Sequence, residues 1–269
     1  MKILILGDVM GPAGRQIIIE KLPELKKKDK IDFVIINGEN SADTGAGITK
    51  KIFDELISAG ADVITTGNHV WDEKETYDFI KNENRLLRPE NLIKGSPGNG
   101  FGIFNSKNKK KVAVINLMGN IFMKKCENVF EEAKKILDKV KLKIDADYII
   151  VDMHAEITSE KKAIGFLFDG KATMVVGTHT HIPTSDHMIL KGGTAYQTDI
   201  GMCGDYDSII GMNKENSLKK FLKQQDTKKH FPAVGAGTLS GLLVTASETT
   251  GLATSLKPIV IGKHLENRI

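Results

Sequence analysis

The sequence predicts an α/β protein in which helices cover mixed β-sheets, and two patterns support this prediction. In residues 1–181, short apolar runs alternate with segments whose apolar residues recur every three or four positions. After residue 187, most apolar runs are short and are separated by glycines, as is typical of strands. A chain of 269 residues, of which 41 % are hydrophobic and 27 % charged, can bury a sizeable core. We therefore expect residues 1–269 to form one domain of mixed sheets.

Six apolar runs in the first part of the chain predict strands that are buried on both faces. Each run is rich in aliphatic residues, and glycine or polar residues follow it within a few positions. The runs are residues 3–6, 32–37, 61–65, 112–117, 148–152 and 172–176.

Segments with helical spacing separate these strands. Pro12 is well placed in a first helical turn and opens a predicted helix over residues 12–28. Gly60 fits the stop signal of a second helix, over residues 49–59. Further helices are predicted at residues 76–81, 129–140, 161–168 and 216–225.

The remaining segments predict loops and short strands. Residues 84–111 contain several glycines and prolines, which favours a loop with one short strand. Four short runs in the last third of the chain predict antiparallel strands. They are residues 188–190, 194–197, 241–246 and 257–261.

The composition argues against several classes of protein. Cys126 and Cys203 form no Cys-x-x-Cys pair, so we expect two free thiols in a reducing cytoplasm. A net charge of +4 is too small to indicate nucleic-acid binding by itself. The apolar run at residues 3–6 is too short for a signal peptide, and no run approaches the about 20 residues of a membrane span. We therefore expect a cytoplasmic protein, and with 7 histidines and 2 cysteines any metal ligands should be oxygen and imidazole groups.

Side chains that can bind metals or protons follow five of the predicted strands. They are Asp8, Glu39 with Asn40, Asn68 with His69, His154, and His179 with His181. Functional groups gather at the carboxyl ends of strands in α/β sheets. Taken singly, Asp8 could cap a helix, Asn68 could form a turn, and His154 could be a core histidine. His179 and His181 are alternate residues and can face the same side. The five strand ends together favour a metal centre.

These motifs resemble those of the calcineurin-like metallophosphoesterases. That superfamily has Asp-x-His, Gly-Asp, Gly-Asn-His, a further His and Gly-His-x-His in this order. The matching segments of this chain are residues 7–8, 38–40, 67–69, 154 and 177–181. Two positions depart from the pattern, because Met10 replaces the first histidine and Glu39 replaces the bridging aspartate.

The two departures resemble a narrower group, the YmdB-like 2′,3′-cyclic-nucleotide phosphodiesterases. Similar segments are Asn-Gly-Glu-Asn-Ser-Ala at residues 37–42, Thr-Gly-Asn-His-Val-Trp at 66–71, and Gly-Gly-Thr-Ala-Tyr-Gln-Thr-Asp-Ile-Gly-Met at 192–202. The resemblance spans nearly the whole chain. It implies a four-layer α/β/β/α sandwich of two mixed β-sheets, in which residues 198–211 wall the active site.

Carried over residue by residue, the resemblance implies two divalent or trivalent metal ions. One ion would be held by Asp8, Glu39, Asn40 and His181. The other would be held by Glu39 as the bridge, Asn68, His154 and His179. Asn40 would take the place that Met10 leaves vacant. Nitrogen and oxygen ligands suit iron, manganese, zinc or cobalt, and the resemblance favours iron or manganese.

The resemblance also implies the reaction, which is hydrolysis of a 2′,3′-cyclic nucleotide to the 3′-nucleotide. A hydroxide that bridges the metals would attack phosphorus, and His69 would protonate the departing ribose oxygen as general acid. Two other interpretations stay open. They are a phosphomonoesterase with the same metals, and a regulatory protein that binds a nucleotide or RNA with little turnover. We also expect a homo-oligomer.

Overall fold

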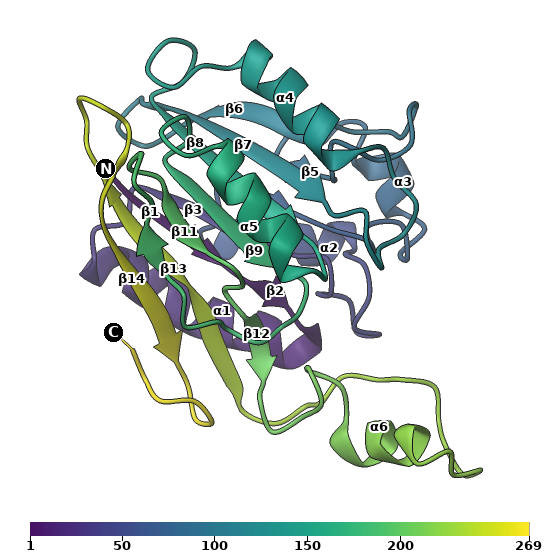
Figure 1. Cartoon of the computed structure of the whole chain (residues 1–269). Coiled ribbons are helices and arrows are strands. Elements are labelled where there is room, and N and C mark those ends of the chain that lie inside the picture. Colours follow the sequence, from purple (N-terminus) through teal and green to yellow (C-terminus); the bar gives the residue numbers. More distant parts are fainter. Residues whose placement is uncertain (269) are drawn as a thin grey trace.

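The computed structural model describes residues 1–268 and has four layers, in which two β-sheets pack face to face between two layers of helices (Figure 1). The predicted α/β/β/α sandwich is therefore confirmed. No helix within these residues is both long and apolar enough to cross a membrane.

The first sheet has eight strands, of which four adjacent ones run parallel to one another. Across the sheet the order is β2 (Asp8–Val9), β12 (Met202–Asp205), β13 (Gly237–Ala246), β1 (Lys2–Leu6), β3 (Phe33–Asn37), β4 (Val63–Thr65) and β5 (Leu86–Leu87), with β14 (Ala253–Ile261) paired to β13. Strand β13 is antiparallel to β1, which makes the sheet mixed.

The second sheet has six strands, and four of them run parallel. Their order is β10 (Met188–Ile189), β11 (Ala195–Gln197), β9 (Met174–Thr178), β8 (Tyr148–His154), β7 (Lys111–Met118) and β6 (Phe101–Asn105). The edge strands β10 and β6 are antiparallel to their neighbours.

Side-chain alternation explains why the central strands are apolar on both faces. In β1, Ile3 and Ile5 point into the core between the two sheets, whereas Leu4 and Leu6 point toward the helices. In β8, Ile150 faces the space between the sheets and Ile149 faces the outer helices. Each sheet therefore contributes one face to the shared core and the other face to its own helical layer.

Helices α1 and α2 cover the first sheet, and α4 and α5 cover the second (Figure 1). The helices are α1 (Gly11–Lys28), α2 (Lys50–Ala59), α3 (Thr76–Phe79), α4 (Val129–Lys139), α5 (Thr158–Leu167) and α6 (Lys214–Phe221). The side chain of Thr49 accepts a hydrogen bond from the backbone N–H of Ile52 and so caps α2. The helix ends at Gly60, whose φ of 120° favours glycine.

Several local predictions differ from the structure. Residues 84–111 contain two strands, β5 and β6, instead of one, and α5 begins three residues earlier than predicted. Strand β11 is antiparallel to β10 but parallel to β9, so the prediction of antiparallel pairing there is only half correct. Strand β12 lies within the segment 198–211, where no strand was predicted. It forms by pairing with β2 and β13, which come from distant parts of the chain, so the local sequence does not indicate it.

The strand register aligns the ends that precede the predicted site residues. Leu6 in β1 lies beside Ile36 in β3, and Asn37 lies beside Thr65 in β4. In the second sheet, His154 at the end of β8 lies beside Thr178 at the end of β9. Polar side chains that follow these ends are therefore brought to one edge of the sandwich.

Candidate metal centre

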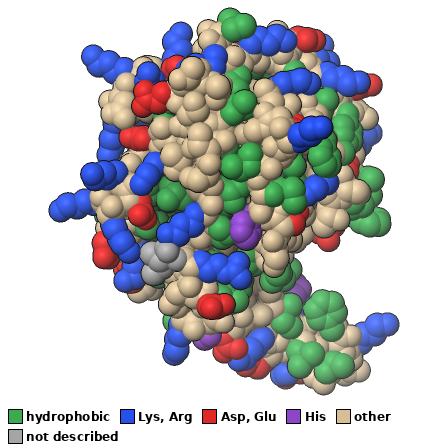
Figure 2. All heavy atoms as spheres, turned by 60° about the vertical axis from the view of Figure 1, so that its left-hand side comes forward, with side chains coloured by type: hydrophobic (Ala, Val, Ile, Leu, Met, Phe, Trp, Pro, Cys, Tyr) green, Lys and Arg blue, Asp and Glu red, His purple; other side chains and the backbone are tan. Residues whose placement is uncertain are grey.

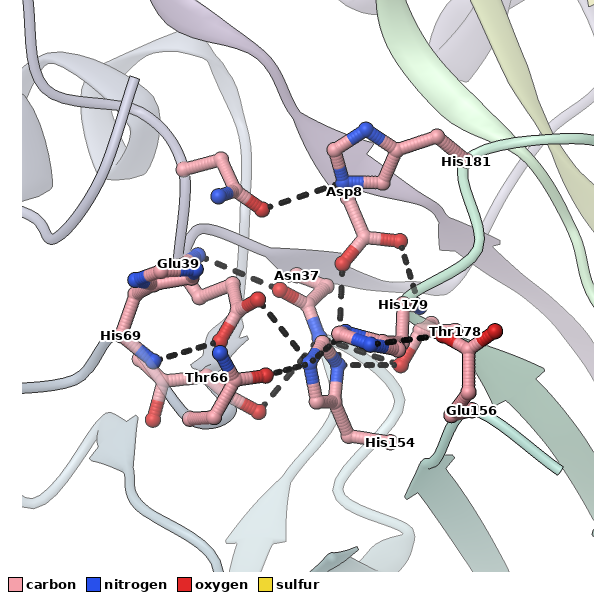
Figure 3. Close-up of polar contacts among 12 residues, drawn as sticks. Asp8, Asn37, Glu39, Thr66, His69, His154, Glu156, Thr178, His179 and His181 are labelled. Atoms are coloured by element: carbon pink, nitrogen blue, oxygen red, sulfur yellow. Dashed lines mark hydrogen bonds and ion pairs between the residues drawn. The ribbon is translucent and has the colours of Figure 1, made fainter. Parts of the chain in front are cut away.

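The side chains predicted as metal ligands converge where the strand ends of the two sheets meet (Figure 3). Asp8 comes from β2, Glu39 and Asn40 follow β3, Asn68 follows β4, His154 ends β8, and His179 and His181 follow β9. Their neighbour His69 lies at the rim of the cluster, and its side chain is about one-third exposed. The hydrogen bond between Asp8 and His179, for example, joins residues that are 171 positions apart in the sequence.

Three atoms crowd the Nε2 atom of His154. Glu39 Oε1 lies 2.9 Å from it, Asn68 Oδ1 3.0 Å and His179 Nδ1 3.1 Å. A ring nitrogen carries either one proton or one lone pair, so it cannot form hydrogen bonds with all three atoms. Carboxylate and carboxamide oxygens and imidazole nitrogens that converge in this way can instead act as the ligands of a shared cation.

A second group of potential metal-ligand atoms lies next to the first. Asn40 Oδ1 is 3.3 Å from His181 Nε2, and Asp8 Oδ2 accepts a hydrogen bond of 3.1 Å from the backbone N–H of His179. Asp8 Oδ1 and Glu39 Oε1 are buried and have no hydrogen-bond partner within residues 1–268. Buried carboxylate oxygens without partners are costly unless a cation neutralises them. The oxygen and nitrogen atoms of this cluster are therefore suited to bind metal ions.

Hydrogen bonds to the far side of each imidazole determine which nitrogen faces the cluster. His154 Nδ1 donates to Thr178 Oγ1 over 2.9 Å, and that hydroxyl donates to Asp152 Oδ1 over 2.7 Å. His181 Nδ1 donates to the backbone oxygen of Ile210 over 2.7 Å. In the neutral form of both residues the lone pair is therefore on Nε2, which is the form that a metal requires.

Two further contacts orient the remaining donors. His179 Nε2 lies 3.1 Å from Glu156 Oε2, which leaves Nδ1 directed toward His154. The Nδ2 group of Asn40 donates to the backbone oxygen of Gly45, so that Oδ1 faces His181. These contacts define the ligating atom of each side chain before any ion binds.

The loop that carries His179 and His181 is held by a buried ion pair. Both histidines have positive φ angles, 99° and 67°, which are strained for residues other than glycine. Between them, the backbone N–H and the hydroxyl of Thr180 donate to Asp199 Oδ2, over 3.1 and 2.7 Å. The ammonium group of Lys161 lies 2.7 Å from the same oxygen, and both charged side chains are only 1 % exposed. The pair therefore supports the strained loop.

Gly67 allows the cluster to form. A Cβ atom at this position would lie 2.3 Å from both Glu39 Oε2 and His154 Nε2. Any larger residue would displace these two side chains, which explains the glycine before Asn68 in the motif.

Burial and neighbouring charges shift the pKa values of the cluster. Burial raises the pKa of Asp8 to about 6. Burial lowers the pKa of His154, but the adjacent Glu39 and Asp8 carboxylates outweigh burial and raise that pKa to about 9. Burial and the neighbouring His154 lower the pKa of His179 to about 3, which keeps His179 neutral and able to bind a metal.

His69 differs from the ligand candidates because its ring faces outward. Its Nδ1 atom lies 2.7 Å from Asp72 Oδ2, and its backbone N–H donates to Glu39 Oε2 over 3.1 Å. Lys124 donates to the other oxygen of Asp72 over 3.0 Å. Partial burial raises the pKa of Asp72, but hydrogen bonds from His69 and Lys124 outweigh burial and hold the pKa below its usual value. The anionic Asp72 thus orients the His69 ring and leaves Nε2 available.

The residues that orient the predicted ligands and His69 were not predicted from the sequence. They are Asp72, Asp152, Glu156, Lys161, Thr178 and Asp199. Asp152 left a detectable signal, because it is a charged residue inside a strand that is otherwise apolar. Asp199 lies in the motif at residues 192–202, but nothing in that motif indicates its partners Lys161 and Thr180, which are 38 and 19 positions away. In contrast, the prediction that residues 198–211 wall the site agrees with the contact between Ile210 and His181.

The four-layer fold and the cluster of carboxylate, carboxamide and imidazole donors together define a metallophosphoesterase of the calcineurin-like type. The chain belongs to the YmdB-like family, because the family model described as YmdB-like protein matches residues 4–259. The resemblance inferred from the motifs is therefore confirmed.

Individual relatives agree with this assignment over the whole chain. The 2′,3′-cyclic-nucleotide 2′-phosphodiesterase of Bacillus subtilis (strain 168) is 45 % identical, and the match covers 97 % of each chain. A solved structure of a novel phosphatase from Mycoplasma pneumoniae is 37 % identical, with a TM-score of 0.89 and coverage of 97 % of this chain and 93 % of that chain. The solved structure of a hypothetical protein from Thermus thermophilus is 36 % identical and has a TM-score of 0.89. The match covers 98 % of this chain and 100 % of that chain.

The pKa shifts predict that metal affinity rises with pH across the neutral range. Protons on His154 and Asp8 compete with metal, so raising the pH from 6 to 8 should increase the affinity by up to about tenfold per pH unit. Competition with a chromophoric chelator, corrected for the chelator's own protonation, measures this slope. A His187→Ala variant should keep it, since His187 lies outside the cluster. An affinity that is constant between pH 6 and 8 would contradict the assignment of His154 as a ligand.

Proposed function

We propose that this chain is a binuclear metal-dependent phosphodiesterase that hydrolyses 2′,3′-cyclic nucleotides to 3′-nucleotides. The observation that carries the proposal is the convergence of Glu39, Asn68 and His179 on one nitrogen of His154, beside a buried oxygen of a second carboxylate, Asp8 Oδ1, that has no hydrogen-bond partner among residues 1–268. The name of the Bacillus subtilis relative supports the choice of substrate class.

We propose two neighbouring ion sites that share Glu39. Asp8, Glu39, Asn40 and His181 would hold one ion, and Glu39, Asn68, His154 and His179 would hold the other. The ligands contain nitrogen and oxygen but no sulfur, which suits iron or manganese and also permits zinc or cobalt. When bound, such ions supply a nucleophile by lowering the pKa of water, and they offset negative charge on the phosphate.

We assign the general acid to His69. Hydrolysis forms a new bond between phosphorus and a water oxygen and breaks the bond between phosphorus and the 2′ oxygen. The departing oxygen needs a proton, which the Nε2 atom of a protonated His69 would donate. Asp72 holds the opposite nitrogen over 2.7 Å, so Nε2 is left to donate to the substrate. Donation to the 2′ oxygen leaves the phosphate on the 3′ oxygen.

Three expectations from the sequence stay predictions. They are the single domain, the cytoplasmic location and the homo-oligomeric state.

The substrate class is tested with three compounds and the metal-loaded protein. We expect hydrolysis of 2′,3′-cyclic AMP and of bis-p-nitrophenyl phosphate, with much slower turnover of p-nitrophenyl phosphate, which is a monoester. A preference for the monoester would instead support a phosphomonoesterase. Binding of the cyclic nucleotide without turnover would support a regulatory protein, and either result would refute the proposal.

Replacement of His69 separates acid catalysis from metal binding. His69→Ala should lower kcat for 2′,3′-cyclic AMP by about 100-fold, because general acids contribute factors of this size. The metal content, measured by elemental analysis, should stay at the wild-type level. His187→Ala is the matched control and should change neither quantity. Loss of metal together with activity would make His69 a ligand.

The shared role of Glu39 is tested by metal stoichiometry. Glu39→Gln should weaken both ions, because it removes the proposed bridging charge. Asn40→Ala is the matched comparison and should weaken one ion only, since Asn40 faces His181 and not His154. Elemental analysis after dialysis measures the number of ions that each variant retains. If Glu39→Gln loses only one ion, the assignment of Glu39 as the bridging ligand is contradicted.

A further inference from the structure

The segment between β12 and β13 projects from the sandwich beside the metal centre. This segment, residues 206–236, contains α6, and we call it the α6 arm. In Figures 1 and 2 it forms the lobe at the lower right. It touches the candidate metal centre directly, because the backbone oxygen of Ile210 accepts the hydrogen bond from His181.

The α6 arm is basic. It contains six lysines and three acidic residues, and it therefore carries most of the chain's net charge of +4. Lys214 pairs with Asp207 over 2.6 Å, and Lys219 lies 3.8 Å from Asp226. The other four lysines form no ion pair with any of residues 1–268. They are Lys220, Lys223, Lys228 and Lys229.

The α6 arm also exposes apolar side chains, and hydrophobic groups gather on its surface in Figure 2. Phe221 is 75 % exposed, Leu222 60 % and Phe231 39 %. Proteins that bind single-stranded nucleic acids combine aromatic side chains, on which bases stack, with basic groups that follow the phosphates. The arm presents both kinds of group close together.

A pocket of about 760 Å³ lies between the α6 arm and the loops around His69. On the arm side, Phe221, Lys229 and His230 line it. His69 lines the opposite side, and the proposed general acid is therefore common to the pocket and the metal centre. Asp72 and Glu73 also lie on that side, so favourable contacts with phosphates are confined to the arm.

We propose that the α6 arm binds the nucleotides that precede a terminal 2′,3′-cyclic phosphate, so that the substrate is the 3′ end of a single-stranded oligoribonucleotide. The inference rests on the proposed function and adds the size of the substrate to it. The cyclic phosphate would lie at the metal centre, within reach of His69. The preceding bases would stack on Phe221, and their phosphates would contact the four unpaired lysines.

The chemistry of the α6 arm favours a single strand over other anionic partners. The unpaired bases of a single strand can enter the pocket and stack on an aromatic ring, whereas the bases of a duplex are already stacked. An oligoribonucleotide also supplies one phosphate per nucleotide, which matches several lysines distributed along one arm. A free mononucleotide would leave these lysines unused.

The experiment compares kcat/KM for 2′,3′-cyclic AMP with kcat/KM for a tetraribonucleotide that ends in a 2′,3′-cyclic phosphate. For the wild-type protein we expect the tetranucleotide to be preferred by about tenfold or more at 50 mM salt. The preference should fall as the salt concentration rises, because phosphate contacts release counterions. Equal values for the two substrates at low salt would overturn the inference.

Two variants assign the preference to the α6 arm. Replacing Lys220, Lys223, Lys228 and Lys229 by Gln should reduce the ratio of the two kcat/KM values to near one. Phe221→Ala should reduce it in part. The matched control replaces four exposed lysines elsewhere, and it should keep the wild-type ratio. The control positions are Lys27, Lys28, Lys134 and Lys139. A wild-type ratio in the arm variant would overturn the inference.

Binding measurements distinguish failure of this inference from failure of the proposed function. Fluorescence anisotropy with a labelled tetraribonucleotide bearing a 3′-phosphate needs no turnover, and the arm variant should bind at least tenfold more weakly than the control. If neither cyclic phosphate is hydrolysed but this difference is seen, the proposed function fails and the α6 arm still binds RNA. If 2′,3′-cyclic AMP is hydrolysed and the difference is absent, only the arm inference fails. Binding to phosphatidylserine vesicles is measured for the same proteins. If the arm variant binds the vesicles more weakly than the wild-type protein does, but binds the oligonucleotide equally well, the arm contacts a lipid surface and the inference is overturned.

Discussion

Two carboxylates buried at the junction of two β-sheets constrain this protein more than any other feature. Asp8 and Glu39 each hold one oxygen without a hydrogen-bond partner among the described residues, and a charge buried in this way is costly unless a cation lies beside it. The imidazoles and carboxamides around them lie at distances that crowd one another but fit a shared ion. The fold can tolerate this arrangement because strands from both sheets end at the same edge, and large apolar cores on either side stabilise the whole.

The side chains behind the ligands make the site rigid. Asp152 is buried and accepts hydrogen bonds from Thr65, Thr178 and Asn37, and Thr178 in turn holds His154. The His154 imidazole is therefore aligned through a chain of contacts that begins inside the sandwich. His69 is held differently, by the exposed Asp72, and its outer position suits a group that meets the substrate instead of the metal. The division between buried ligands and an accessible acid follows from burial alone.

The α6 arm presents a surface that the sandwich does not need for its own core. Its apolar side chains are exposed, and four of its lysines have no acidic partner within the described residues. These exposed basic and apolar groups are the ones that the proposed oligonucleotide would contact. Because the arm contacts His181 through Ile210, a ligand bound there would lie next to the reacting groups.

The sequence by itself determined the apolar strands, the approximate positions of the helices and the seven side chains that converge on the candidate site, because periodicity and strand-end motifs are local signals. Only the tertiary structure decided the parallel direction of β11, the pairing of β12, and the roles of Asp152, Glu156 and Asp199. These features depend on which distant segments meet when the two sheets pack. A short polar or glycine-rich run carries no local sign of its partner, and a buried carboxylate takes its role from the groups that surround it.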